Sequence, residues 1–233
     1  MAVTPELLST FAIFKPLPET VLSELAKQAT LSKFARRGVV LRAGIKEDHL
    51  CFLFEGRLQG VDFTIDGREV GLYFVEPGDF CGELGLFDQG PQPEYVIALT
   101  QAVVIAVPMA QLREIMLKAP SIANMLGLKM ATRVRQLSTH RSLLALPNVP
   151  QRVCCQLWAL IPANAGEKSN VAEIKNPPTH MEIAIMLNLS RETVTRVFQS
   201  LQNRQIVKRD GTALLLVNDV QSLKRLANGD DAL

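Results

Sequence analysis

The chain reads LSRETVTR at residues 189–196, and this stretch predicts more about the protein than any other. The hydroxyl of Ser190 can accept a hydrogen bond from a free amide of a first helical turn, so we expect a helix to begin here. Val194, Phe198 and Leu201 follow at spacings of four and three, which gives this helix one apolar face. The remaining face carries most of the polar side chains: Arg191, Glu192, Thr195 and Arg196.

The residues on either side of this helix predict its partners. Thr179 and Glu182 have the spacing of a capping box before an apolar run, which predicts a preceding helix of about two turns. Asn188 supplies a tight turn between the two helices. Downstream, Asp210-Gly211 separates two β-prone runs and predicts a hairpin. Two helices, a turn and a hairpin make a winged helix-turn-helix, which is a DNA-binding arrangement.

Positive charge is concentrated on the same segment. Residues 191–209 contain five Lys or Arg and one acidic residue, an excess of +4, whereas the whole chain has a net charge of +2. Arginine can donate two hydrogen bonds to guanine O6 and N7, and a carboxylate can accept one from cytosine. We therefore predict double-stranded DNA as a partner; a solvated helix with ordinary surface arginines is the alternative. The predicted DNA-binding residues are Thr179, Ser190, Arg191, Glu192, Thr193, Thr195 and Arg196.

The first half of the chain has the pattern of an antiparallel β-domain. Ten of the 14 glycines lie between residues 38 and 90, with β-rich runs between them. Residues 61–65 alternate apolar and polar, and Asp66-Gly67 signals a hairpin. Short strands that fold back repeatedly predict a β-roll or jelly roll. Helical patterns over residues 18–30 and 109–118 flank this domain.

A long helix is expected between the β-domain and the winged helix. From Ser121 to about Leu146 the chain has no proline, which allows about 37 Å of helix at 1.5 Å per residue. Apolar residues recur along it at intervals of about three and four, and Gly127 would let two backbones approach closely. We predict a parallel homodimer along this seam; a helix lying lengthwise on its own β-domain is the alternative. The seam residues are Met130, Val134, Leu137 and Leu144.

The predicted fold class is therefore α+β, with three parts. Residues 1–119 form a β-roll effector-sensing domain, 120–146 a dimerisation helix, and 147–233 a winged-helix DNA-binding domain. Pro147 and Pro150 mark the second boundary because proline breaks helices. Residues 162–178, rich in Asn, Gly, Lys and Pro, are expected to be a connector.

Several classes of protein are not expected. The sequence opens without a basic-then-apolar signal segment, and its longest apolar stretch, residues 95–110, is interrupted and short for a bilayer, so we expect a cytoplasmic protein with no membrane partner. Its four cysteines and three histidines lack the spacing of a metal or haem site. For Cys154-Cys155, structural filling is favoured over redox sensing. Without a catalytic triad or phosphate loop, no enzymatic activity is expected.

The order of β-roll, long helix and winged helix resembles the CRP/FNR superfamily of bacterial transcription regulators. Its most specific parts are residues 190–196 and the cassette GDFCGELGLF at residues 78–87, and the resemblance spans nearly the whole chain. It implies a homodimeric regulator that recognises a TGTGA-like palindrome through Arg191, Glu192 and Arg196. RNA polymerase is a further possible partner.

The effector site departs from the cAMP-binding members of that family. There an Arg-Ser or Arg-Thr pair follows the cassette, whereas this chain reads PQPEY at residues 91–95. The Glu94 carboxylate would repel a phosphate by about 4 kcal/mol at 4 Å for an effective dielectric constant of 20, so cAMP binding in the usual manner is not expected. Members of the family that bind cyclic di-GMP also lack this arginine and carry an acidic residue nearby, and the Glu94 carboxylate can accept hydrogen bonds from guanine N1 and N2. The resemblance therefore makes cyclic di-GMP the leading candidate effector. The expected effector-binding residues are Gly82, Glu83, Leu84, Glu94, Arg133 and Ser138.

Two further interpretations stay open at this point. The chain can be a nucleotide-sensing module that controls a protein partner, or a DNA binder that needs no ligand.

Glu83 and Arg133, which link the cassette to the long helix in relatives, are expected to form a structural salt bridge of small energetic value.

Overall fold

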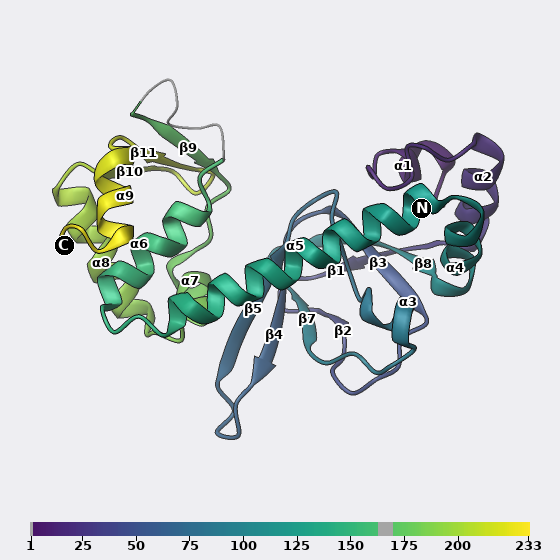
Figure 1. Ribbon diagram of the computed structural model, residues 1–233, viewed down its shortest axis with the longest axis horizontal. Coiled ribbons are helices and arrows are strands. Elements are labelled where there is room, and N and C mark those ends of the chain that lie inside the picture. The colour runs from purple at the N-terminus through teal and green to yellow at the C-terminus, as the bar shows by residue number, and fades with distance from the viewer. Residues whose placement is uncertain (1, 163–169) are drawn as a thin grey trace. The chain divides into compact units, whose positions relative to one another are not determined.

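The computed structural model describes residues 2–162 and 170–233. The chain divides into two compact units, residues 1–137 and 138–233 (Figure 1). The division falls within α5 (Pro120–Leu144), a helix of 25 residues that matches the long helix predicted from the sequence. The three-part division at residues 119 and 146 stays a prediction. Over the described ranges, no helix is both long and apolar enough to cross a membrane.

The first unit is built on two four-stranded antiparallel sheets, as the β-roll prediction required. Their strand orders are β1-β8-β3-β6 and β2-β7-β4-β5. The predicted hairpin at Asp66-Gly67 joins β4 to β5, and Gly67 has a φ of 78°, in the left-handed region that glycine tolerates. The strands are β1 (Thr30–Phe34), β2 (Val39–Leu41), β3 (His49–Glu55), β4 (Leu58–Phe63), β5 (Glu69–Val75), β6 (Phe80–Cys81), β7 (Tyr95–Ala98) and β8 (Ala102–Pro108).

Short helices cover the ends of these sheets. They are α1 (Pro5–Ser9), α2 (Glu19–Gln28), α3 (Leu84–Asp88) and α4 (Met109–Lys118). An aromatic cluster fixes the N-terminal helices to the sheet: the Phe14 and Phe52 rings lie 4.7 Å apart, and Phe52 also contacts Phe11 and Phe80. A second cluster of aliphatic side chains, which includes Leu58, fills the space inside the roll.

In its described residues, 138–162 and 170–233, the second unit has four further helices and a three-stranded sheet of order β10-β11-β9. The helices are α6 (Val149–Ala159), α7 (His180–Leu187), α8 (Arg191–Asn203) and α9 (Val220–Asn228), and the strands are β9 (Ala172–Lys175), β10 (Val207–Asp210) and β11 (Leu214–Val217). The two helices and the hairpin confirm the predicted winged helix-turn-helix.

One part of the sequence prediction was wrong. The stretch 162–178 is not only a connector, because β9 lies within it and pairs with β11; residues 163–169 lie outside the described residues. Along β9, Ala172 and Ile174 are buried while Glu173 and Lys175 are exposed. This alternation is typical of a strand with one buried face, but four residues are too few to identify a strand without its partner.

Candidate nucleic-acid interface and the polar cluster of the β-roll

The helix-turn-helix begins with the capping box that the sequence predicted. Thr179 Oγ1 accepts from the Glu182 amide at 3.2 Å, and Glu182 Oε2 accepts from the Thr179 amide at 2.9 Å. At the other end of α7, Asn188 takes a left-handed conformation with a φ of 51° and turns the chain. Ser190 then caps α8 by accepting from the Thr193 amide at 3.1 Å. These side chains fix where both helices begin and thus where the first turn of α8 lies.

Helix α8 presents two chemically different faces. Its buried residues are Val194, Val197, Phe198 and Leu201, which contribute to the core of the second unit. Arg191, Glu192 and Arg196 are exposed, whereas Thr193 and Thr195 are half-buried. The exposed residues are two guanidinium groups and one carboxylate on the first turns of the helix. This is the chemical set that can donate to guanine and accept from cytosine in a major groove.

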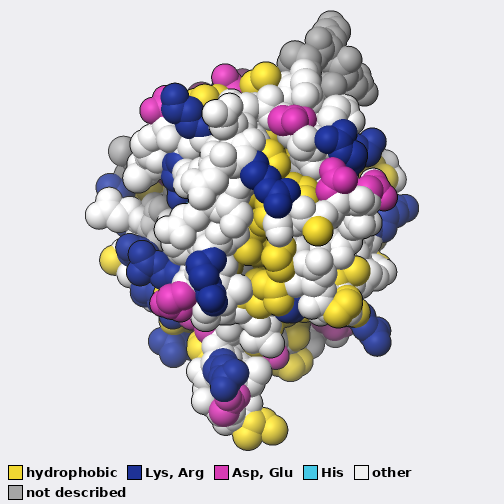
Figure 2. Space-filling model, turned by 90° about the vertical axis from the view of Figure 1, so that its left-hand side faces the viewer, with side chains coloured by type: hydrophobic (Ala, Val, Ile, Leu, Met, Phe, Trp, Pro, Cys, Tyr) yellow, Lys and Arg dark blue, Asp and Glu magenta, His cyan; other side chains and the backbone are white. Residues whose placement is uncertain are grey.

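Hydrogen bonds between neighbours order part of this polar face. Thr193 Oγ1 lies 2.9 Å from Ser190 Oγ and accepts from Arg196 Nη2 at 3.3 Å. The pKa of Glu192 is lowered, first by a hydrogen bond from its own amide and then by the Ser190 hydroxyl, so this exposed carboxylate is charged and can accept. On the side of the molecule that Figure 2 shows, Lys and Arg side chains are scattered among other side chains and do not form one continuous patch.

His180, the first residue of α7, was missed by the sequence reasoning. Its Nδ1 lies 2.9 Å from Thr195 Oγ1, and its ring lies 4.3 Å from the Phe198 ring. Burial lowers the pKa of His180, and the positive charges of Arg209 and Arg191 lower it further. Its place in the capping-box motif was visible in the sequence, but its contact with α8 was not.

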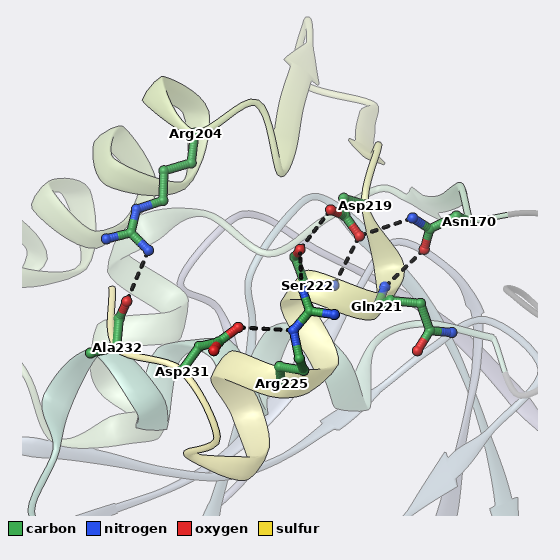
Figure 3. Close-up of polar contacts among 8 residues, drawn as sticks. All are labelled: Asn170, Arg204, Asp219, Gln221, Ser222, Arg225, Asp231 and Ala232. Atoms are coloured by element: carbon green, nitrogen blue, oxygen red, sulfur yellow. Dashed lines mark hydrogen bonds and ion pairs between the residues drawn. The ribbon is translucent and has the colours of Figure 1, made fainter.

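A separate polar network holds the C-terminal end of α8 and the start of α9 (Figure 3). Arg204, the C-cap of α8, donates to the Ala232 carbonyl at 2.8 Å. Asp219 caps α9 by accepting from the Ser222 amide at 2.9 Å, and Asn170 Nδ2 donates to the same carboxylate at 2.9 Å. The chain after α9 is therefore held against the C-terminal end of α8, the helix that carries the basic face.

A second polar cluster lies in the β-roll. The Arg133 guanidinium of α5 forms an ion pair with the Glu83 carboxylate, and the side chains are only 10% and 3% exposed. Arg133 also donates to the Phe80 carbonyl at 3.3 Å, and its guanidinium carbon lies 4.2 Å from the centre of the Tyr73 ring. The pair predicted from the sequence is present, and it is buried.

Tyr73 connects this ion pair to Glu94. The Tyr73 hydroxyl donates to the Glu94 carboxylate, and burial raises the pKa of both groups. Gly60 faces the same ring: a Cβ atom there would lie 2.5 Å from Tyr73 Cζ, so the ring rests directly on bare backbone. Glu94 is therefore a buried acceptor that already has one partner. Tyr73 is a member of the cluster that the sequence analysis did not name.

The six expected effector-binding residues have different surroundings. Glu83, Glu94 and Arg133 meet around Tyr73, and Gly82, with a φ of 88°, precedes Glu83. Leu84 begins α3 and is 36% exposed. Ser138 belongs to the second unit, where its carbonyl accepts from Ser142 Oγ at 3.2 Å. Their roles in binding an effector stay predictions.

The four cysteines are free thiols. Cys51, Cys81 and Cys154 are buried, and burial raises the pKa of Cys51 and of Cys154 to about 12. Cys155 is half-buried, and its Sγ donates to the Ala227 carbonyl at 3.1 Å. The thiolate is the reactive form of cysteine, so thiols with a raised pKa suit the structural role favoured from the sequence.

Comparison with known protein families decides the identity of both units. Residues 31–119 match the cyclic nucleotide-binding domain, and residues 151–226 match the Crp-like helix-turn-helix domain. The chain belongs to the CRP/FNR family of transcription regulators. A CRP/FNR regulator carries a helix-turn-helix for DNA binding and is not an enzyme, as the sequence predicted.

Individual relatives agree with this assignment. A CRP-like cAMP-activated global transcriptional regulator of Mycobacterium tuberculosis is 28% identical over 222 residues, which cover 95% of this chain and 99% of the relative. The structure of FixK2 from Bradyrhizobium japonicum is similar with a TM-score of 0.73 and 21% identity, over 88% of this chain and 98% of FixK2. The c-di-GMP responsive regulator CLP of Xanthomonas campestris has a TM-score of 0.64 and 22% identity, over 82% and 94%.

Proposed function

We propose that this CRP/FNR regulator acts as a homodimer that reads an inverted repeat of TGTGA-like half-sites, with one α8 from each chain in the major groove. The observation that carries the proposal is the exposed row of Arg191, Glu192 and Arg196 above a fully buried opposite face. Each arginine can donate two hydrogen bonds to a guanine, and the carboxylate can accept from a cytosine. RNA polymerase is the further partner that we propose, since the family acts on transcription.

The dimer is supported by one face of α5. Gly127 and Val134 are seven residues apart, as are Met130 and Leu137, which gives the spacing of a coiled-coil seam. Val134 is 63% exposed and Leu137 41%, and a Cβ atom at Gly127 would meet nothing within 4 Å. Large apolar side chains exposed in a row are typical of an interaction surface. A second copy of α5 covers this seam in the proposed dimer.

The DNA proposal is tested by binding to a duplex with two inverted TGTGA half-sites about 34 Å apart. Arg191→Ala and Arg196→Ala should each cost about 1–3 kcal/mol and relax discrimination at one base pair. Arg225→Ala is the matched control, because Arg225 is an exposed arginine on α9 with its own ion pair to Asp231. Equal affinity and selectivity in wild type and the three variants would exclude this face of α8 as the one that contacts the bases.

The dimer is tested separately by sedimentation. Val134→Glu places a carboxylate on the proposed seam and should shift the protein toward monomer. Glu114→Gln, an exposed position on α4, is the control. A wild-type protein that is monomeric at the concentrations at which it binds DNA would remove the dimer from the proposal.

For the effector, the match to a cyclic nucleotide-binding domain suggests a cyclic nucleotide, and we propose cyclic di-GMP rather than cAMP. Residues 91–95 lack the phosphate-binding arginine of cAMP-binding relatives. Glu94 can exchange the Tyr73 hydroxyl for N1–H and N2–H of guanine and gain a hydrogen bond. CLP of Xanthomonas campestris, a c-di-GMP responsive regulator, has a similar fold.

A ligand-independent DNA binder is the second candidate, because Glu94 and Arg133 already have partners within the β-roll. Isothermal titration with cAMP, cyclic GMP, cyclic di-AMP and cyclic di-GMP separates the two. Cyclic di-GMP should release heat with wild type and much less with Glu94→Ala. No heat from any nucleotide would favour the ligand-independent candidate and leave the DNA proposal intact.

A further inference from the structure

His180 packs against the helix that carries the proposed DNA-reading residues and is half-buried there. It is the first residue of α7, and its ring contacts α8 at Thr195 and Phe198. Two arginines act on the same ring electrostatically, Arg191 from the start of α8 and Arg209 from β10 of the wing. Groups of α7, α8 and β10 thus act on one imidazole.

The hydrogen bonds fix how the neutral imidazole must be protonated. Thr195 Oγ1 donates its single proton to the Arg191 carbonyl at 2.9 Å, so it can only accept from His180. His180 Nδ1 therefore carries the proton, and Nε2 of the neutral ring is an acceptor. A phosphate oxygen is also an acceptor, so neutral His180 cannot bind it. Protonation turns Nε2 into a donor.

The two charged groups that lower the pKa of His180 among the described residues, Arg209 and Arg191, are both positive. Burial lowers this pKa most, followed by the charges of Arg209 and then Arg191. On its own helix the nearest acidic group is Glu182, which is held in the capping box with Thr179. A DNA backbone brought against this surface would offset the two arginines and stabilise a charged imidazole. DNA binding should therefore raise the pKa of His180.

We propose that His180 is a positioning residue that couples DNA binding to proton uptake: its protonated ring holds α8 through Thr195 and donates from Nε2 to a backbone phosphate. This inference rests on the proposed DNA-binding function. If the bound-state pKa exceeds the free-state pKa, the protein takes up a proton on binding. Affinity therefore rises as the pH falls through the window between the two values.

The experiment is a DNA-binding titration at about pH 7.5 and about pH 6, where histidine changes its charge. The probe is the duplex with two inverted TGTGA half-sites. If DNA raises the pKa of His180 by about one unit, Kd for wild type should be lower at the lower pH by up to about tenfold per subunit, and by up to about a hundredfold for the dimer with its two His180 side chains. His180→Gln keeps an N–H for Thr195 but cannot titrate, so its Kd should stay nearly constant.

The chain has only three histidines, which makes the control simple. His49→Gln removes a histidine of the β-roll that pairs with Asp48, and it should keep the full wild-type pH dependence. If His180→Gln keeps that dependence, or if wild type has none, the inference is wrong while DNA binding stands. If wild type does not bind the duplex at either pH, the proposed function fails as well.

If His180→Gln does not fold, a second measurement on wild type still tests the inference. The His180 ring resonances of wild type are titrated by NMR, with and without the duplex. A higher pKa in the complex supports the inference, and an unchanged or lower pKa overturns it.

Discussion

Breaking the ion pair between Glu83 and Arg133 should strongly destabilise the β-roll. Both side chains are at least nine-tenths buried, and Arg133 also contacts the Phe80 carbonyl and the Tyr73 ring. Glu83→Leu would leave a buried guanidinium without its counter-charge, which costs about 3–5 kcal/mol. Arg133→Met would leave a buried carboxylate and should cost a similar amount. Such a loss is a large fraction of the stability of a domain, typically about 5–15 kcal/mol.

The double variant, Glu83→Leu with Arg133→Met, separates charge from packing. Replacing both partners with apolar side chains of similar size is often neutral, because no unpaired charge is left. Here the contact between the guanidinium and the Tyr73 ring is also lost, which costs up to about 2 kcal/mol when buried. The double variant should therefore be more stable than either single variant.

Urea unfolding of wild type, the two single variants and the double variant measures these free energies. Circular dichroism follows both units, while Trp158, the only tryptophan, reports the second unit and serves as an internal control. The single variants should shift the circular dichroism transition and leave an independent Trp158 transition in place. Single losses below about 1 kcal/mol, or losses that add in the double variant, would refute the reasoning because they are typical of a solvated pair.

Three other predictions concern caps and buried acids. Ser190→Ala removes the acceptor for the Thr193 amide and should cost about 1 kcal/mol in thermal unfolding, whereas Ser190→Gly should cost only a few tenths; equal losses would contradict the capping role. Asp219→Ala should cost about 1–2 kcal/mol near neutral pH, because the carboxylate caps α9 and accepts from Asn170. The pKa of Asp219 is lowered, first by the Ser222 hydroxyl. The stabilisation that the Asp219 carboxylate provides is therefore present above the ordinary pKa of about 3.9 and is lost as the pH falls through the folded-state pKa. A destabilisation by Asp219→Ala that does not shrink in acid counts against this assignment. Glu94→Gln keeps an acceptor for Tyr73 and removes the buried carboxylate charge; burial raises the pKa of Glu94. The variant should therefore gain stability over wild type as the pH rises above about 4.3, as measured by urea unfolding at several pH values. A stability difference that stays constant with pH would show that Glu94 is not desolvated.

Local sequence patterns predicted most elements of the second unit. Thr179 with Glu182, Asn188 and Ser190 place both ends of α7 and the start of α8 within one or two residues of the observed bounds, because caps and turns depend on neighbours three or four positions away. The hairpin at Asp210-Gly211 follows from the same local chemistry. Strand β9 could not be predicted in this way, since its burial comes from β11, about forty residues along the chain.

The polar clusters depended on tertiary structure. The sequence paired Glu83 with Arg133 by resemblance, and it assigned the pair the small energy of a surface salt bridge. Only the fold shows that these two residues, 50 positions apart in the sequence, come together and that both charges are buried next to the Tyr73 ring. The same holds for His180, whose contact with Thr195 needs α7 and α8 to cross. Caps and amphipathic faces are properties of neighbouring residues, whereas desolvation is a property of everything packed around a group.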